Sequence, residues 1–99
     1  MLFNFTNIVN ETAYVTTPTV FTSMSCKDMK LDIDTATQSG CTKVVFDFSR
    51  TKKFDSRAHD YLKKVRRDIK PENFFVINVS GQPLHILETT NCDEWIKQP

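Results

Sequence analysis

The stretch KVVFDFSRTKKFDSRAHDYLKKV, residues 43–65, decides the fold. It begins with a short run of apolar and β-branched residues, 43–48, which is typical of a buried strand. It then changes to apolar residues spaced three and four apart, which indicate one face of an amphipathic helix: Ala58, Tyr61, Leu62, Val65 and Ile69. Pro71 ends this helix, because proline cannot continue it. A strand followed by a helix is one half of a β-α-β unit, so the stretch predicts a parallel sheet covered by helices.

The N-terminal half predicts two strands and a helix. The strands span residues 2–8 and 13–21, a tight hairpin at residues 10–11 joins them, and Pro18 interrupts the second because proline cannot donate to a ladder. The helix begins near Ser25, with Ser23 or Ser25 as its cap, and ends at Gly40. Its apolar positions are Cys26, Met29, Ile33 and Ala36. Its charged residues, Asp32 among them, are expected on the opposite side.

The C-terminal third continues the alternation of strands and helices. Residues 74–79 predict a buried strand, and a helix follows with Ser80 as a plausible cap, Pro83 in its first turn, and Leu84 and Leu87 facing inward. A final turn over residues 93–96 would bury Trp95. The order β-β-α-β-α-β-α predicts an α/β fold with a small, mixed, mostly parallel sheet, in which the first hairpin adds an antiparallel edge.

Size and composition indicate one domain over residues 1–99. The net charge of +1 gives no global field that would attract nucleic acid or an anionic membrane. The three cysteines are far apart and are read as reduced thiols. The sequence contains neither a signal-like N-terminus nor an apolar run of the ~20 residues that span a bilayer, so the cytoplasm is the expected location.

The quoted stretch resembles the STAS family, whose best-known members are bacterial anti-sigma factor antagonists. The family has an apolar strand that runs into Asp-hydrophobic-Ser, here residues 47–49, then a short loop, an Asp-Ser pair, here Asp55-Ser56, and a helix. FFVINVS, residues 74–80, and PLHILETTNCDEWI, residues 83–96, are similar to the family's next strand and closing helix. The likeness covers about half of the chain well and the N-terminal half by the order of elements.

The resemblance implies both a fold and a function. The implied fold is the STAS fold, with helices packed mainly on one face of the sheet. In the family, the serine of the Asp-Ser pair is phosphorylated by a partner kinase and dephosphorylated by a metal-dependent phosphatase, which places the phosphorylation site at Ser56. The chain is then expected to be a non-enzymatic regulator that binds a cognate serine kinase or anti-sigma-type protein while Ser56 is unmodified and is released by phosphorylation. Family members of this size control sigma factors, stress responses or biofilm formation.

The expected partner-binding residues surround this serine. They are Lys52, Lys53, Asp55, Arg57, His59 and Asp60, with Phe21 and Thr22 from the loop that faces the partner in the family. His59 is interpreted as a surface residue. Residues 57–60 replace the small residues usual in the family, and residues 18–21 stand where the family usually has Gly-Glu-Leu-Asp, so the identity of the partner is left open. A monomer or weak dimer is expected, with no cofactor, metal, direct nucleic-acid contact or membrane insertion.

The physical chemistry of a helix start supports a switch at Ser56. Unpaired N–H groups and the helix dipole stabilise an anion there, and a phosphate adds about −1.5 to −2 charges. One alternative is a constitutive structural subunit of a transporter or lipid-transport complex, in which Ser56 only caps the helix. A weaker one is a small serine hydrolase using Asp55, Ser56 and His59, although the sequence has neither a G-x-S-x-G elbow nor a glycine-rich phosphate loop.

Overall fold

The computed structural model describes residues 5–97. In chain order its elements are β1 Thr6–Val9, β2 Thr12–Thr16, β3 Val20–Phe21, α1 Ser23–Gln38, β4 Lys43–Asp47, β5 Lys53–Phe54, α2 Ser56–Ile69, the 3₁₀ turn η1 Pro71–Asn73, β6 Phe74–Ile77, α3 Gly81–Thr89 and the 3₁₀ turn η2 Asp93–Trp95. The predicted order of elements is confirmed, with the short strands β3 and β5 in addition. The predicted opening strand corresponds to β1, and its first positions, 2–4, lie outside the described residues.

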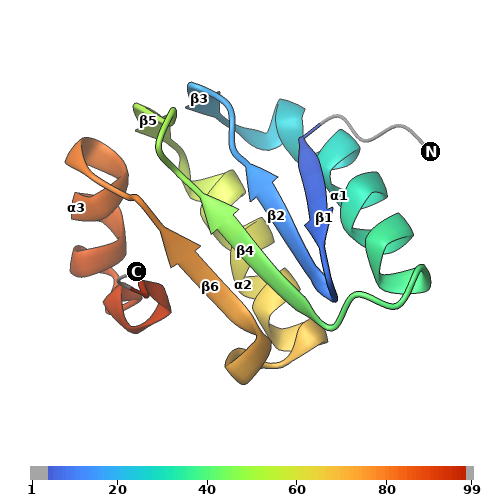
Figure 1. Ribbon diagram of the computed structural model, residues 1–99. Helices are drawn as coiled ribbons and strands as arrows, with labels where there is room; N and C mark the ends of the chain where they lie inside the picture. The colour runs from blue at the N-terminus through green and yellow to red at the C-terminus, as the bar shows by residue number, and fades with distance from the viewer. Residues whose placement is uncertain (1–4, 98–99) are drawn as a thin grey trace.

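Four strands form the main sheet in the order β1-β2-β4-β6 (Figure 1). The β1–β2 hairpin is antiparallel and turns at Asn10, whose φ of 57° is one that asparagine tolerates better than most residues. The other two pairings are parallel, with Tyr14 opposite Val45 and Val45 opposite Phe75. The predicted mixed sheet with an antiparallel edge is therefore confirmed.

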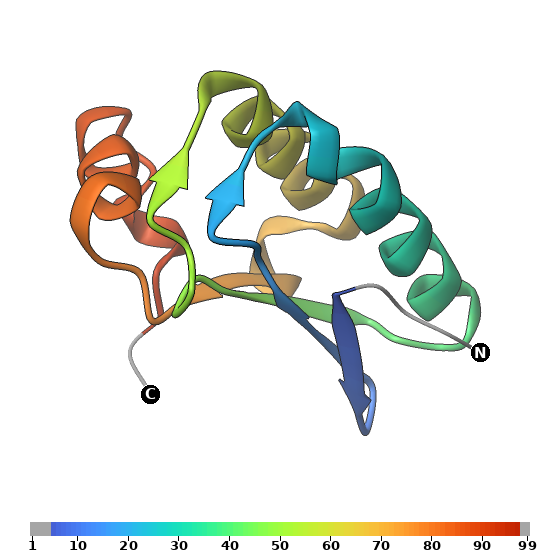
Figure 2. The ribbon, with the colours of Figure 1, turned by 90° about the horizontal axis from the view of Figure 1, so that it is seen from above.

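The helices lie on one side of this sheet. Figure 2 shows α1 and α2 over one face, with α3 on the same side next to β6. Strand residues that point toward the helices are buried against the apolar stripes of α1 and α2. The innermost residues are Ala13, Val15, Phe46 and Val76 from the strands, with Met29 from α1 and Leu62 from α2. Packing on one face is what the fold prediction required, and it leaves the other face of the sheet without a helix among residues 5–97.

The edge strand β1 is held by a buried carboxylate on α1. Asp32 accepts hydrogen bonds from the backbone N–H of Phe5 at 2.7 Å and from the Thr6 hydroxyl at 2.8 Å. The prediction that Asp32 lies on the solvent side of the helix is wrong, because it is buried at the junction of α1 and β1. The bonds offset the cost of burying the charge, and they fix the start of the strand.

The predicted strand over residues 13–21 is divided in two. β2 ends at Thr16, and β3 resumes at Val20 in a separate two-stranded sheet, where it pairs in parallel with β5. Pro18 lies in the gap, in keeping with its missing N–H. The cap of α1 also differs from the prediction: Thr22, not Ser23 or Ser25, accepts the hydrogen bond from the Met24 backbone N–H.

The C-terminal third follows the prediction closely. Trp95 is buried in η2, and Ile96 forms a single parallel bridge to Val76 of β6. Ser80 occupies the N-cap position of α3, but its side chain makes no capping hydrogen bond. Within residues 5–97, none of the helices has the length and apolar character needed to cross a membrane.

Candidate functional site

The site is built where β3 and β5 run side by side. Val20 pairs with Lys53 and Phe21 with Phe54, so the start of α1 and the start of α2 are brought to the same end of the molecule (Figures 1 and 2). Phe21, Phe48 and Phe54 pack as an aromatic trio beneath this ladder, with ring centroids 5.3–5.9 Å apart. Phe21 was predicted to contact a partner, but its side chain is fully buried in this trio and anchors the site instead.

The free edge of β5 is occupied by the side-chain amide of Gln82. Its Oε1 accepts from the Phe54 N–H at 3.0 Å and its Nε2 donates to the Phe54 carbonyl at 3.0 Å, as a neighbouring strand would. On the other side, the buried hydroxyls of Thr17 and Thr51 bond to each other, and Thr51 donates to the Pro18 carbonyl at 2.7 Å. These contacts hold both loops that precede the site, and sequence reasoning did not identify them.

Asp55, and not Ser56, caps α2. The Asp55 backbone is extended, and its Oδ1 accepts from the Ala58 N–H at 2.8 Å. Ser56 is the first helical residue, is exposed, and its hydroxyl makes no hydrogen bond among residues 5–97. The interpretation of Ser56 as a helix cap is therefore wrong. The carboxylate stabilises the helix start, and the hydroxyl is left facing solvent.

His59 is a core residue, so the prediction of a surface histidine is wrong. It is 4% exposed and stacks on Trp95 at 5.4 Å between ring centroids, with Phe54 at 5.7 Å. Its Nε2 lies 3.1 Å from the Thr90 hydroxyl, which donates its own proton to the Ile86 carbonyl at 2.7 Å. Since that hydroxyl has one proton, Nε2 is the donor and carries the hydrogen of the neutral ring.

Burial lowers the pKa of His59, and the charge of Lys63 lowers it further, while Asp60 opposes the shift. The neutral ring is therefore favoured near neutral pH. The same nitrogen that a serine hydrolase would need for proton abstraction is engaged with Thr90. No hydrogen bond joins His59 to Ser56 among the described residues.

The pKa of Cys26, a residue of α1, is raised by its surroundings. Burial, and then the negative charge of Asp55, raise the pKa of the Cys26 thiol to about 11. The thiol donates to the Thr22 carbonyl at 3.5 Å. Cys26 is thus a neutral packing residue near neutral pH.

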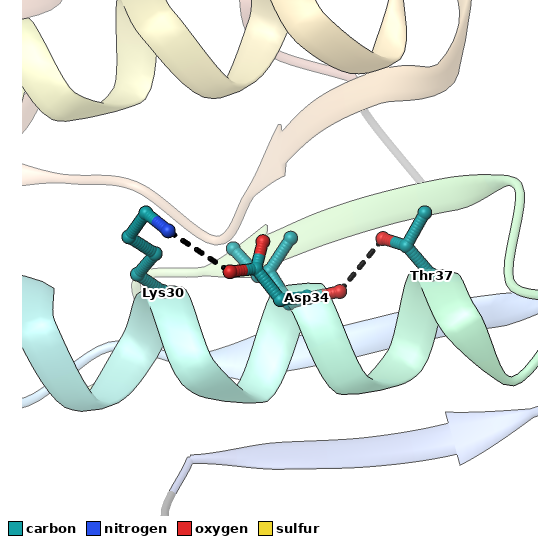
Figure 3. A network of polar contacts seen from close by, with 4 residues as sticks. Lys30, Asp34 and Thr37 are labelled. Carbon is teal, nitrogen blue, oxygen red and sulfur yellow. Dashed lines mark hydrogen bonds and ion pairs between the residues drawn. The ribbon is translucent and has the colours of Figure 1, made fainter.

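Exposed charges surround Ser56. Lys52, Lys53, Arg57 and Asp60 are all exposed, and none of them takes part in an ion pair among residues 5–97. Ion pairs occur elsewhere, for example on α1, where Lys30 meets Asp34 at 3.0 Å (Figure 3). The cations beside Ser56 are therefore available to an acidic ligand or partner.

Two exposed apolar side chains complete this end of the molecule. Val20 on β3 is 51% exposed, and Met24, in the first turn of α1, is 87% exposed. Val20 lines a shallow hollow with Thr22, Lys53 and Asp55. We call the following residues the Ser56 surface: Val20, Thr22, Met24, Lys52, Lys53, Asp55, Ser56, Arg57 and Asp60. Sequence reasoning missed Val20 and Met24, which lie at the start of a short strand and in the first turn of a helix, where apolar patterning does not reveal exposure.

Comparison with known proteins supports the fold. The structure is similar to that of the anti-sigma factor antagonist SpoIIAA in its unphosphorylated form, with a TM-score of 0.81, 15% identity, and coverage of 95% of this chain and 85% of that chain. The chain has the STAS fold. It is also similar to the NMR structure of the protein TM1081, with a TM-score of 0.78, 17% identity, and coverage of 100% of this chain and 81% of that chain. No family model and no curated protein sequence matches the chain.

Asp55 and Ser56 lie at the start of α2, directly after a strand and a short connection, which is the order of elements that the resemblance in sequence implied. The predicted site residues that share the exposed surface are Thr22, Lys52, Lys53, Asp55, Ser56, Arg57 and Asp60. Phe21 and His59 lie beneath it, in the core.

Proposed function

We propose that this chain is a partner-switching regulator controlled by phosphorylation of Ser56. The unmodified Ser56 surface binds a cognate serine kinase of the anti-sigma type. Phosphorylation by that kinase releases the chain, and a metal-dependent phosphatase restores the binding form. The fold of an anti-sigma factor antagonist supports this role, since SpoIIAA carries that name and is described in an unphosphorylated form.

One observation carries the proposal: the Ser56 hydroxyl is exposed and makes no hydrogen bond within residues 5–97. A serine that capped the helix would lose its cap on modification, and stability would fall. Here Asp55 provides the cap through its bond to the Ala58 N–H. A kinase can therefore modify Ser56 without breaking a contact of the fold. The alternative of a constitutive subunit relied on Ser56 as the cap, and no observation favours it.

The phosphate would act on binding rather than on folding. At the first position of α2 it lies within the positive end of the helix dipole, where an anion is stabilised by about 0.3–1 kcal/mol at an exposed site. Its negative charge would also neutralise the neighbouring cations Lys53 and Arg57. An acidic partner attracted by those cations would then meet a dianion at the centre of the contact. We expect release without any change of fold.

Apolar anchors give the contact its affinity in the unmodified state. Met24 is the most exposed of the large apolar residues among the described residues, and Val20 lies above the hollow beside Lys53. Binding energy in protein interfaces concentrates in such side chains when a partner desolvates them. The partner surface that fits is therefore apolar at its centre and acidic at its rim.

The test begins with the native state of Ser56. Mass spectrometry of the chain isolated from its own cells is expected to find one phosphate on Ser56, and the kinase that adds it is then purified. In calorimetry with that kinase, Ser56→Asp is expected to weaken binding by at least about tenfold, which is 1.4 kcal/mol, while Ser56→Ala binds like the parent. Thr42→Asp, an exposed position outside the Ser56 surface, is the control for added charge.

Two results would overturn the proposal. One is a native chain that carries no phosphate on Ser56 under any growth condition in which the kinase is active. The other is a kinase complex equally tight for Ser56→Asp and for the parent, with Met24→Ser also without effect.

A further inference from the structure

The face of the sheet opposite the helices carries a continuous apolar row. Tyr14 on β2 is paired with Val45 on β4, and Val45 is paired with Phe75 on β6, so the three side chains cross the sheet at one level. They point away from the core, because strand neighbours alternate between the two faces and Val44, Phe46 and Val76 point into it. The row lies in one shallow hollow on this face.

No helix of the described residues covers this row. Figure 2 shows α1, α2 and α3 on the other side of the sheet. Tyr14 is 39% exposed, and Phe75 is half-buried beside Lys97, whose Nζ lies 4.5 Å from the ring centroid. Val45, between them, is 8% exposed and lines the hollow between the two aromatic side chains. A row that no helix of residues 5–97 covers, with aromatic residues at both ends, indicates a surface that meets another protein.

The opposite charges at the two ends of β4 indicate which protein would bind this face. Lys43 and Asp47 lie on the same face as Val45, two residues before it and two after it. If two copies face each other with the strands β4 antiparallel, Val45 meets Val45 and Lys43 of each copy meets Asp47 of the other. The surface is therefore complementary to itself.

We propose that this face binds a second copy of the chain, about a twofold axis that runs along the row from Tyr14 to Phe75. Such an axis stacks the two sheets face to face, the arrangement found in β-sandwiches. It places the two Tyr14 side chains against each other and forms two Lys43–Asp47 ion pairs. The carboxylate of Asp47 is already oriented by the Ser49 N–H at 2.9 Å and by Asn78 at 3.2 Å.

The size of the face sets the strength of this dimer. Four strands spaced about 4.8 Å apart, with about five residues each, present roughly 300 Å² per copy. The total of roughly 600 Å² is about half of what a stable interface buries, so the dimer is weak and forms at high concentration. The two Lys97 side chains approach each other at the Phe75 end and weaken it further.

Dimerisation through this face leaves both Ser56 surfaces exposed, because they lie at the helical side of the molecule (Figure 2). If the proposed function holds, a dimer presents two binding sites to a dimeric partner. The linkage of the two sites raises the apparent affinity without any new contact. Dimerisation itself does not depend on Ser56, so its test is independent of the proposed function.

The test exchanges the two charges. Sedimentation velocity of the parent from on the order of 10 μM to 1 mM is expected to show a reversible monomer–dimer equilibrium. Lys43→Asp alone and Asp47→Lys alone each place like charges across the axis, and each is expected to weaken dimerisation at least about tenfold. An equimolar mixture of these two variants restores both ion pairs, and a heterodimer is expected at the parent's concentration range.

Asp47→Lys also removes hydrogen bonds, so its thermal unfolding is measured first. If it does not fold, Tyr14→Ser replaces it, because an exposed aromatic contributes to the dimer but little to the core. Lys97→Ser is expected to strengthen the dimer. A parent that stays monomeric at the highest concentration overturns the proposal, and so does a dimer that Lys43→Asp and Tyr14→Ser leave intact.

Discussion

Ser56 and His59 lie three residues apart at the start of α2, yet one is exposed and the other is buried. Ser56 faces solvent with no hydrogen bond among the described residues, whereas His59 stacks on Trp95 and bonds to Thr90. Within a single helical turn, the side chain of one residue can be modified without loss of a contact, whereas the side chain of the other is held by packing. His59 was predicted to contact the partner, and Ser56 was predicted to be the phosphorylation site that controls the contact.

This difference shows how a small domain can carry a switch. The first turn of α2 is held in place by the stacking of His59 on Trp95 and by the capping hydrogen bond of Asp55. The Ser56 hydroxyl is therefore exposed on a well-packed part of the structure. A change of charge at Ser56 can then alter binding without altering the fold. The different surroundings of Ser56, His59 and Asp55 lead to a separate prediction for each residue.

The largest effect is expected at the buried position. His59→Ala removes an aromatic ring between Trp95 and Phe54 and is expected to lower the free energy of unfolding by about 3 kcal/mol. Ser56→Ala is expected to change it by no more than about 0.5 kcal/mol, because no contact is lost. Urea unfolding of both variants measures this. Equal losses at the two positions would contradict the assigned burial.

A smaller effect separates the two candidate caps. Asp55→Ala removes the acceptor of the Ala58 N–H and is expected to cost about 1 kcal/mol, which is typical of a lost N-cap. Ser56→Ala is the matched control in the same urea titration. If Ser56→Ala cost as much and Asp55→Ala cost nothing, the cap would belong to the serine, and phosphorylation would then disturb the helix.

The order of elements could be predicted because its signals are local. The helical stripe of α2, the short apolar run of β4 and the turn at Asn10 each follow from neighbouring residues. The strand β5 could not be predicted, since it has two residues and is stabilised by β3 and by the amide of Gln82, which lies 28 residues from Phe54 in sequence. Contacts of that range leave no periodic signal.

The positions of polar residues were the weaker part of the prediction. His59 and Asp32 were assigned to the surface because their side chains are polar, although helical spacing places His59 three residues before the buried Leu62 and Asp32 three after the buried Met29. Periodicity alone would have identified both. In contrast, the exposure of Met24 and Val20 follows from the end of a helix and of a short strand, which apolar patterning does not reveal.

The smallest effect expected is a pH dependence of stability that originates at His59. Burial and Lys63 lower its pKa in the folded chain below the ordinary value of about 6.5 that it has when unfolded. As pH falls through about 6.5, the unfolded chain therefore binds the proton first, and the free energy of unfolding decreases. The free energy of unfolding becomes independent of this residue once pH is below the pKa of His59 in the folded chain.

His59→Gln is expected to remove this decrease, as measured by urea unfolding from about pH 8 to about pH 5.5. His85→Gln, at an exposed position on α3, is the control, and a decrease that persists in His59→Gln but disappears in His85→Gln would assign it to the wrong histidine.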